Sequence, residues 1–407
     1  MIAISLSPNT QKKDYMTALA QLFSPWSYIH GQYVKKVEQW FQKYFNARFA
    51  ISFDSGRSAQ YAILSALGIG KGDEVLVQAF TCVAVPNSVL WTGAKPIYVD
   101  IEKNSYNMSP EDLVKKINKN SKAIIIQHTF GQAAKIKEIC QIAKKHKLVL
   151  IEDCAHGMGA SVNSQKLGTF GEVAFFSFGR DKVVSSVFGG MVVTRDKRIG
   201  ERVKEFQKNL AYPSVFWIVQ QLLHPIFFSI ILPTYNFFNL GKVILKVSQA
   251  LHLLGKPVAE MEKKGQRPKF YPRKLPNSLA RLALVQLGRL ESFNKKRKVI
   301  AAVYAKELSI KIKDQDIHVR FPLLVNRRDE LLKSAKSRGI LLGDWYSHVV
   351  DPKGVDLTKI GYAFGSCPMA EQSATKIINL PTYPRMSVND VRKVVRIVKD
   401  YASDKNS

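Results

Sequence analysis

In the segment Leu148-Val149-Leu150-Ile151-Glu152-Asp153-Cys154-Ala155-His156, four apolar residues run directly into two carboxylates. An uninterrupted apolar run of this length is typical of a β-strand that is covered on both faces, as in a parallel sheet. Sheets of this kind bind their ligands at the carboxyl ends of the strands. Asp153 is therefore expected at the ligand edge of a sheet. The alternative is that its carboxylate only caps the following helix.

Short apolar, β-branched runs recur through the first half of the chain, and helical patterns lie between them. Apolar residues three or four positions apart predict helices over 58–67, 110–117 and 136–146. This alternation predicts an α/β fold with a mostly parallel, doubly wound sheet. The predicted strands are Phe49–Phe53, Glu74–Gln78, Ile97–Asp100, Lys122–Gln127, Leu148–Glu152, Val173–Phe178 and Met191–Thr194.

The composition of the 407 residues excludes a disordered or collagen-like chain, because 46% are hydrophobic and 23% are charged. The net charge of +29 predicts an anionic partner, which leaves nucleic acid, phosphorylated metabolites and an acidic membrane surface. Four widely spaced cysteines, none in a C-x-x-C pair, favour neither a disulfide framework nor a metal site. The cysteines fit a reducing compartment, and the N-terminal stretch Met1–Pro8 has no basic region and no long apolar run, so we expect a cytoplasmic protein without a secretory signal.

Two loops place further candidate ligand-binding residues at the ligand edge of the sheet. Asp54-Ser55-Gly56-Arg57-Ser58-Ala59 follows a predicted strand and opens a helix, so its free N–H groups and the helix dipole suit a phosphate. The alternative is an ordinary helix cap. In the second loop, Ser177 ends a strand, Lys182 follows five residues later, and Gly189-Gly190 leads into the next strand. A solvated surface lysine is the alternative for Lys182.

Together, a phosphate cradle, an acid and a lysine at one sheet edge are what pyridoxal 5'-phosphate requires. The lysine forms a Schiff base with the cofactor, and the acid keeps the pyridine nitrogen protonated so that the ring can accept electrons. The helix N-terminus holds the phosphate.

At these residues the chain resembles the DegT/DnrJ/EryC1/StrS family of sugar aminotransferases, which have the type I fold of pyridoxal-phosphate-dependent transferases. The resemblance covers nearly the whole chain except about 207–269. It implies a large cofactor-binding domain over 1–206, a hydrophobic and basic helical insert over 207–269, and a smaller α/β C-terminal domain over 270–407. The matching segments are Gly31–Phe45, Ser55–Ala59, Gly72–Val75, Gly93–Pro96 with Asp100, His128–Gln132, Ile151–His156, Ser177–Phe178 with Lys182, Gly189–Gly190, Gln286–Leu287 and Leu380–Pro381.

The resemblance assigns roles to individual residues. Lys182 is the lysine that binds the cofactor and shuttles the proton, and Asp153 pairs with the pyridine nitrogen. His156 lies near the ring hydroxyl, with a surface helix histidine as the alternative. Ser177 binds the phosphate.

The helix after Gly56 completes this phosphate site, through the backbone amides of Arg57 and Ser58. The side chain of Arg57 either adds charge to the phosphate or faces solvent.

Three positions depart from the family pattern. Cys82 stands where relatives have an aromatic residue stacked on the cofactor ring, so stacking comes from elsewhere or is weaker. Pro272 stands where the partner subunit's Asn reaches the phosphate, and Arg273 or Lys274 is the candidate replacement. Phe188 precedes Gly189, where many relatives have an acidic or small residue. These differences concern substrate choice more than reaction class.

Because Lys182 is present, the resemblance favours transamination over the dehydration catalysed by members with His at that position. The implied reaction moves an amino group from an amino acid, glutamate by preference, to a nucleotide-linked keto-sugar for surface glycan biosynthesis. A homodimer is implied as well. The alternatives are a dehydratase that uses the same cofactor and a non-catalytic sensor or scaffold with the aminotransferase fold.

The segment 209–241 contains no Lys, Arg, Asp or Glu, and Val215–Leu232 is almost wholly apolar. It has three interpretations: an extra helical layer at an interface, a peripheral contact of 209–269 with an anionic membrane, and a true span. A span would divide one active-site fold across the bilayer, so it is the weakest of these. Nucleic acid is not expected, because the basic residues are dispersed and no binding module is recognisable.

Overall fold

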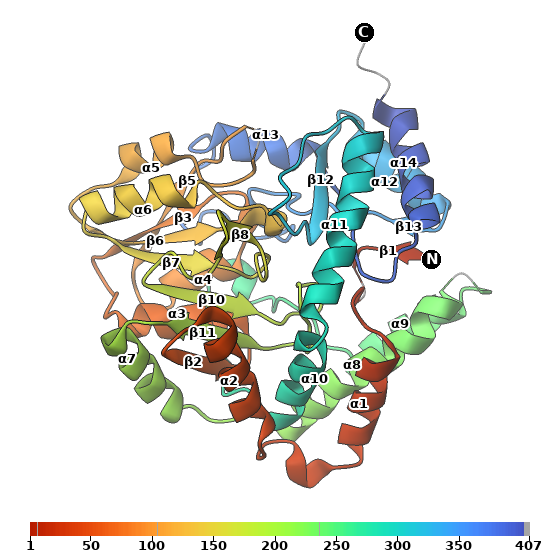
Figure 1. Cartoon of the computed structure of the whole chain (residues 1–407), viewed down its shortest axis with the longest axis horizontal. Helices are drawn as coiled ribbons and strands as arrows, with labels where there is room; N and C mark the ends of the chain where they lie inside the picture. The colour runs from red at the N-terminus through yellow and green to blue at the C-terminus, as the bar shows by residue number, and fades with distance from the viewer. Residues whose placement is uncertain (6, 104, 236, 403–407) are drawn as a thin grey trace.

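The computed structural model describes the whole chain except residues 6, 104, 236 and 403–407. Its centre is a seven-stranded sheet with helices on both faces (Figure 1). This confirms the predicted α/β fold. The ends of each predicted strand lie within two residues of the ends of an observed strand. The sheet order is β2-β11-β10-β7-β6-β3-β5, from β2 (Phe49–Phe53), β3 (Glu74–Gln78), β5 (Lys95–Val99), β6 (Ser121–Gln127), β7 (Val149–Asp153), β10 (Val173–Ser177) and β11 (Gly190–Thr194).

Only β11 runs against its neighbours in this sheet; it pairs antiparallel with both β10 and β2. The strands β10, β7, β6, β3 and β5 pair in parallel, and β2 has the direction of β10. The carboxyl ends of β2, β10, β7 and β6 therefore meet at one edge. At that edge β11 begins, at Gly190.

The helices begin where the sequence offers a capping side chain. Ser55, Ser109 and Asp196 each accept a hydrogen bond from the backbone N–H three residues later, which satisfies one of the free donors of the first turn. The α-helices are α1 (Lys12–Leu22), α2 (Tyr33–Phe45), α3 (Gly56–Ala66), α4 (Ala84–Leu90), α5 (Pro110–Lys116), α6 (Ile136–Lys145), α7 (Lys197–Lys208), α8 (Val215–Thr234), α9 (Leu240–Ala250), α10 (Asn277–Leu287), α11 (Leu290–Glu307), α12 (Arg328–Ser337), α13 (Pro368–Lys376) and α14 (Val388–Ala402).

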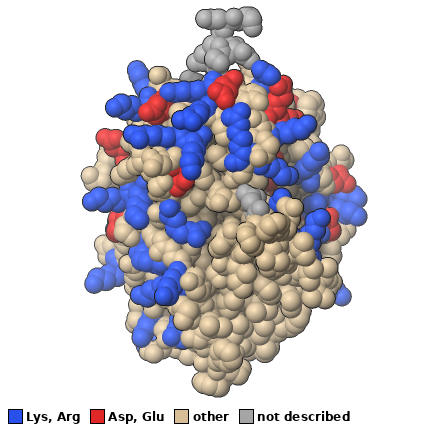
Figure 2. Space-filling view, turned by 90° about the vertical axis from the view of Figure 1, so that its right-hand side faces the viewer, with Lys and Arg blue, Asp and Glu red and all other residues tan. Residues whose placement is uncertain are grey.

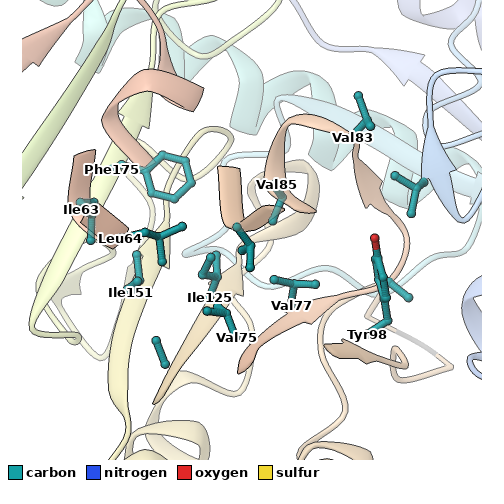
Figure 3. Close-up of a cluster of buried hydrophobic side chains, with 14 of the residues drawn as sticks. Ile63, Leu64, Val75, Val77, Val83, Val85, Tyr98, Ile125, Ile151 and Phe175 are labelled. Carbon is teal, nitrogen blue, oxygen red and sulfur yellow. The ribbon is translucent and has the colours of Figure 1, made fainter. Parts of the chain in front are cut away.

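The sheet buries both faces because successive strand residues point to opposite sides. Leu76 and Ile124 pack with the apolar residues of α5 and α6. Val77 and Ile125, each one position further along its strand, belong to the cluster that contains Ile63 of α3 (Figure 3). The strands are therefore apolar at consecutive positions because helices cover both faces of the sheet.

The C-terminal part has its own core, in which α11, α12 and α14 pack with the pair β12 and β15. Its helical pattern from Ser278 to Leu308 is two helices, not one, because Gly288 and Arg289 separate α10 from α11 and Arg289 has non-helical dihedral angles. The remaining strands lie outside the central sheet, and all but β12 and β15 have two residues: β1 (Ile2–Ala3), β4 (Thr81–Cys82), β8 (Ser161–Val162), β9 (Gln165–Lys166), β12 (Arg320–Leu324), β13 (Ile340–Leu341), β14 (Val350–Asp351) and β15 (Ile377–Pro381).

The charge-free segment forms α8, which packs against α1 and α10, and α9 folds back against it. By length and composition α8 is apolar enough to cross a membrane, with a mean hydropathy of 1.8, and 39% of its most apolar window is buried inside the protein. Among its buried residues are Gln221, His224 and Pro225. The chain before α8 and the chain after it also pair directly, since β4 and β14 are hydrogen-bonded. These features argue against a span.

Candidate active site

A cavity of about 640 Å³ opens at the carboxyl edge of the sheet. It gathers loops after β2, β7 and β10 with residues from the C-terminal part and from the 209–269 segment. Of the eight site residues expected from the sequence, seven line this cavity, and Ser58 lies behind it. The seven are Gly56, Arg57, Cys82, Asp153, His156, Ser177 and Lys182.

The N-terminus of α3 forms one end of the cavity. The N–H of Ser58 already donates to the Oγ of Ser55 at 3.2 Å, so Ser58 is occupied with capping the helix. The N–H groups of Gly56 and Arg57 have no hydrogen-bond acceptor among the described residues. Ser177 lies against them, since a Cβ added at Gly56 would come within 2.8 Å of its Cβ. Two free amides and one hydroxyl therefore converge at a helix N-terminus, which is a site for a phosphate.

Asp153 is the last residue of β7 and is 4% exposed. Its Oδ1 accepts a hydrogen bond from the N–H of Ala155 at 2.9 Å. Burial raises the pKa of this carboxyl, and the Ala155 hydrogen bond and the charge of Lys182 only partly offset it. A cationic nitrogen placed in the cavity would remove this penalty.

Lys182 follows β10, and its Nζ lies 2.9 Å from the Nε2 of His156. The Nδ1 of His156 accepts the N–H of Phe130 at 3.3 Å, so in a neutral ring the proton is on Nε2, facing Lys182. Burial, then the charges of Lys182 and Arg320, hold the pKa of His156 well below its usual range, which keeps this ring neutral. His156 is 3% exposed, so the surface-histidine alternative is wrong.

The backbone at Lys182 is anchored by side chains from distant parts of the chain. Asn9 donates to the carbonyl oxygen of Lys182 at 2.6 Å, and Arg297 donates to the carbonyl of Val183 at 3.0 Å. Arg297 also donates to the Oδ1 of Asn9 at 2.8 Å. Because Arg297 is 1% exposed and burial lowers its pKa to about 9, this guanidinium acts as an internal scaffold for the lysine loop.

Arg57 neither faces solvent nor stands free to add charge to a phosphate. It forms an ion pair with Glu262, which is 1% exposed, and donates to the carbonyl of Pro257 at 2.7 Å. Its guanidinium also lies 5.1 Å from the centre of the Tyr271 ring. Arg57 thus ties the start of α3 to the segment that follows α9.

The C-terminal part contributes residues that the sequence analysis missed. Arg320, at the start of β12, forms an ion pair with Asp181 and lies 3.6 Å from the centre of the Trp345 ring. Trp345 and Tyr346 line the cavity near Cys82, which has no aromatic side chain of its own. No local pattern marks these residues, because they are 139 positions or more from the lysine loop that they complete.

The 209–269 segment forms another wall, which was also not predicted. His224 and Phe228 of α8 line the cavity, and their rings stack with centres 4.5 Å apart. Arg180 donates to the carbonyl of Gly255 at 2.8 Å, while its buried Nε and Nη2 have no hydrogen-bond partner among the described residues. Burial lowers the pKa of Arg180 to about 10.

The candidate substitutes for the partner subunit's Asn lie outside the cavity of their own chain. Arg273 donates through its side chain to the carbonyl of Lys269 at 3.2 Å, and Lys274 donates to that of Lys208 at 2.8 Å. Both therefore hold backbone close to the sheet edge in this chain.

One buried cluster, His128, Glu152 and Cys154, has the composition of a metal site. The Glu152 carboxylate is already saturated: it accepts the N–H groups of Gly168, Phe170 and Gly171 at 2.6–2.9 Å and lies 3.2 Å from the His128 ring. The cluster is therefore explained as a structural anchor for the loop at 168–171.

The sequence also matches a known protein family. The DegT/DnrJ/EryC1/StrS aminotransferase family matches residues 9–212 and 243–399. The chain belongs to this family. The unmatched stretch between the two ranges contains α8.

Individual relatives match over almost their whole length. The GDP-perosamine synthase of Escherichia coli O157:H7 is 26% identical, over 97% of this chain and 96% of the relative. A pleiotropic regulatory protein of Geobacillus stearothermophilus is 27% identical, over 98% of both. The crystal structure of S. venezuelae DesV superposes with a TM-score of 0.75 at 24% identity, over 97% of this chain and 96% of DesV.

The aminotransferase therefore uses pyridoxal 5'-phosphate, the cofactor of its family. The residues of the cavity fit this group. The amides of Gly56 and Arg57 and the hydroxyl of Ser177 suit its phosphate, and the buried carboxylate of Asp153 suits its pyridine nitrogen. The amine of Lys182, which lines the same cavity, suits its aldehyde.

Proposed function

We propose that the protein transfers an amino group from an amino acid, glutamate by preference, to a keto-sugar linked to a nucleotide, for the synthesis of a surface glycan. The observation that carries the proposal is the placement of Lys182 in one cavity with Asp153, Ser177 and the N-terminus of α3. The similarity to a GDP-perosamine synthase supports a nucleotide sugar as the acceptor.

Pyridoxal phosphate, when bound, supplies an electron-accepting ring and the carbonyl that carries the amino group between the two substrates. The residues of the protein bind the cofactor and transfer the proton. Asp153 holds the pyridine nitrogen protonated, and the amides of Gly56 and Arg57 with Ser177 hold the phosphate. The Lys182 amine, with the neutral His156 ring 2.9 Å away, would take the proton from the amino-bearing carbon of the amino-acid donor in one half-reaction. In the other half-reaction it would deliver a proton to the carbon of the keto-sugar that receives the amino group. Phe228 and Trp345 add apolar side chains to the cavity lining and exclude water.

We also propose a homodimer in the cytoplasm, at the inner face of the membrane. The dimer is carried over from the family resemblance. Its test is the mass of the purified protein in solution by light scattering, where a monomer at all concentrations would contradict it.

The decisive experiment combines a spectrum with a product assay. The purified wild-type protein is expected to show the visible absorbance of lysine-bound pyridoxal phosphate, and Lys182→Ala is expected to abolish that band. With glutamate and a nucleotide-linked keto-sugar, the wild type should release 2-oxoglutarate and an amino-sugar nucleotide. A cofactor band with no 2-oxoglutarate would favour the dehydratase alternative.

A regulatory protein without catalysis is the second candidate, because one relative of similar identity is named as a regulator. The presence of both Lys182 and Asp153 in the cavity weighs against it. A wild-type spectrum with no cofactor band, even after addition of pyridoxal phosphate, would favour the regulator and contradict the enzyme.

A further inference from the structure

The helix α9 turns an apolar stripe toward solvent. Leu240, Val243, Val247 and Leu251 recur three or four positions apart, so they share one face, and they are between 45% and 62% exposed. Helices of globular proteins normally bury such a stripe. Just before the helix, Phe237 and Phe238 are 63% and 89% exposed. These six residues are called the outer stripe below.

The surface around the outer stripe is also poor in charge. Figure 2 shows a broad region without charged side chains on the side of the molecule where α1, α8 and α9 lie in Figure 1. No Lys, Arg, Asp or Glu occurs in 209–241. Next to α8, the α1 region exposes Phe23 and Trp26, at 75% and 78%. Contiguous exposed apolar surface of this kind marks an interaction site.

A second cavity, of about 790 Å³, lies against α8, and its lining contains more basic than acidic side chains. Phe228, Leu232 and Pro233 of α8 form its apolar wall. Its cations Lys12, Arg385 and Lys393 have no carboxylate within 4.0 Å in the part of the chain that the structure describes, whereas its fourth cation, Arg338, pairs with Asp400 at 3.2 Å. Its one acid, Asp390, accepts hydrogen bonds from the N–H and hydroxyl of Ser387.

We infer that α8 and α9 dock the protein on an anionic membrane. The outer stripe enters the lipid interface, and the second cavity takes the phosphate of an anionic phospholipid headgroup. An apolar helix face beside unpaired cations is the arrangement that binds such a surface, where apolar burial and attraction to anionic lipid add. The inference gives a lipid class and a binding site to the membrane location proposed above. It does not depend on the amination reaction.

The charge of the chain favours a membrane over a second copy of the protein as the occupant of this surface. A two-fold interface would place each copy's surface against itself and bring the same cations together, Lys246 on α9 among them. That juxtaposition of like charges at this surface is unfavourable, whereas an anionic lipid surface neutralises these cations. A span is excluded by the cavity, because Lys182 and Arg320 come from opposite sides of α8 in the chain and meet there.

Flotation of the full-length protein tests the inference directly. The probes are vesicles of phosphatidylcholine alone and of phosphatidylcholine mixed with phosphatidylglycerol. The wild type should float with the mixed vesicles. Phe237→Ser/Phe238→Ser should lose flotation, and Arg385→Glu/Lys393→Glu should bind at least about 25-fold more weakly, since each cation near an anionic surface contributes about fivefold.

Two matched variants control for general changes in surface polarity and charge. Phe364→Ser removes an aromatic side chain that is 82% exposed near α13, and Lys144→Glu/Lys145→Glu reverses two cations on α6, both far from α9 in Figure 1. Both controls should float like the wild type, and all four variants should keep their aminotransferase activity on soluble substrates. That activity separates the inference from the proposed function.

Three results would overturn the inference. One is wild-type protein that stays at the bottom of the gradient with both vesicle types. Another is equal binding to both types, which would exclude the headgroup site. The third is a loss of dimer mass by light scattering in Phe237→Ser/Phe238→Ser without any vesicle binding by the wild type, which would assign the surface to a second copy.

Discussion

The Nζ of Lys182 and the Nε2 of His156 lie 2.9 Å apart in a buried cavity, and the other ring nitrogen of His156 accepts a backbone N–H. This pairing orients the proton of a neutral imidazole toward the amine. His156 therefore acts on the same atom that the proposed chemistry uses, and its substitution provides the first test.

Two substitutions of His156 should distinguish the effect of its polar ring nitrogens from the effect of its ring shape. His156→Gln keeps a polar group within reach of Lys182 and should retain kcat within about tenfold, whereas His156→Phe leaves the amine unpaired and should lower kcat by more than about tenfold. The visible band of the bound cofactor should titrate at a different pH in the Phe variant, measured by absorbance. An unchanged kcat and an unchanged titration in His156→Phe would reject the role.

Gly56→Ala should weaken cofactor binding. The new Cβ would lie 2.8 Å from the Cβ of Ser177, so the start of α3 or the end of β10 must move where the phosphate is proposed to bind. We expect the Kd for pyridoxal phosphate, measured by absorbance titration, to rise by about tenfold or more, while overpacking costs about 1–3 kcal/mol of unfolding free energy.

Gly70→Ala is the matched control, because its Cβ would lie 3.6 Å from its nearest neighbour, an ordinary contact. It should leave the Kd unchanged. If Gly56→Ala binds the cofactor as tightly as this control, the α3 amides are not the phosphate site.

Asp181→Asn should destabilise the junction between the lysine loop and the C-terminal part. It leaves the guanidinium of Arg320, 3% exposed, without its carboxylate. Such losses cost about 3–5 kcal/mol in a fully buried pair, and less here because Asp181 is 29% exposed. The measurement is urea unfolding. Asp181→Asn/Arg320→Met should recover part of the loss, because no buried charge is then left alone.

Asp400→Asn breaks a comparable pair at the surface, where Arg338 and Asp400 are both about half exposed. It should change the unfolding free energy by less than about 1 kcal/mol. Equal effects of Asp181→Asn and Asp400→Asn would show that the Arg320 pair is solvated in solution.

Three buried histidines should lower stability as the pH falls below about 6.5, while Asp54 and Asp351, whose pKa values burial raises to about 7 and about 6, contribute in the opposite direction. Burial first, and nearby cations second, hold the pKa values of His156 and His224 well below 6.5, and burial lowers the pKa of His318 to about 4. At these histidines the unfolded chain binds more protons than the folded one between each folded pKa and 6.5, so their contribution to stability, present above pH 6.5, is lost on acidification.

Urea midpoints between pH 7.5 and 5.5 check this sign. His224→Gln should reduce the slope by up to about 1.4 kcal/mol per pH unit, which is the contribution of one proton. A slope in His224→Gln that equals or exceeds the wild-type slope would contradict the prediction.

The fold was predictable because its strands carry their signal locally. A strand such as Val149–Asp153 must be apolar at successive positions to be covered on both faces, and the sequence shows this without any knowledge of its neighbours. The residues that end these strands, Asp153 and Ser177, were found for the same reason. Their shared edge follows from parallel pairing alone.

The far wall of the site was not predictable in this way. Arg320 pairs with Asp181 across 139 positions, and His224 reaches the cavity from a helix whose sequence gives only an apolar character. Ser58 belongs to the predicted loop, yet its amide is used in capping the helix, a choice made by the local geometry of Ser55. Neither kind of contact produces a periodic pattern of residues from which it could be predicted.

By itself, the sequence determined the seven-stranded α/β sheet, the order of motifs along it, and the lysine, acid and hydroxyl that the family's chemistry needs. These features depend on residues close together in the chain, or on strands that end at a common edge. Only the tertiary structure decided that Arg57 pairs with Glu262, that α8 forms a wall of the cavity, and that α9 turns its apolar stripe outward. Each of these outcomes depends on which surfaces meet after long loops close, and on the burial that results, which no local pattern records.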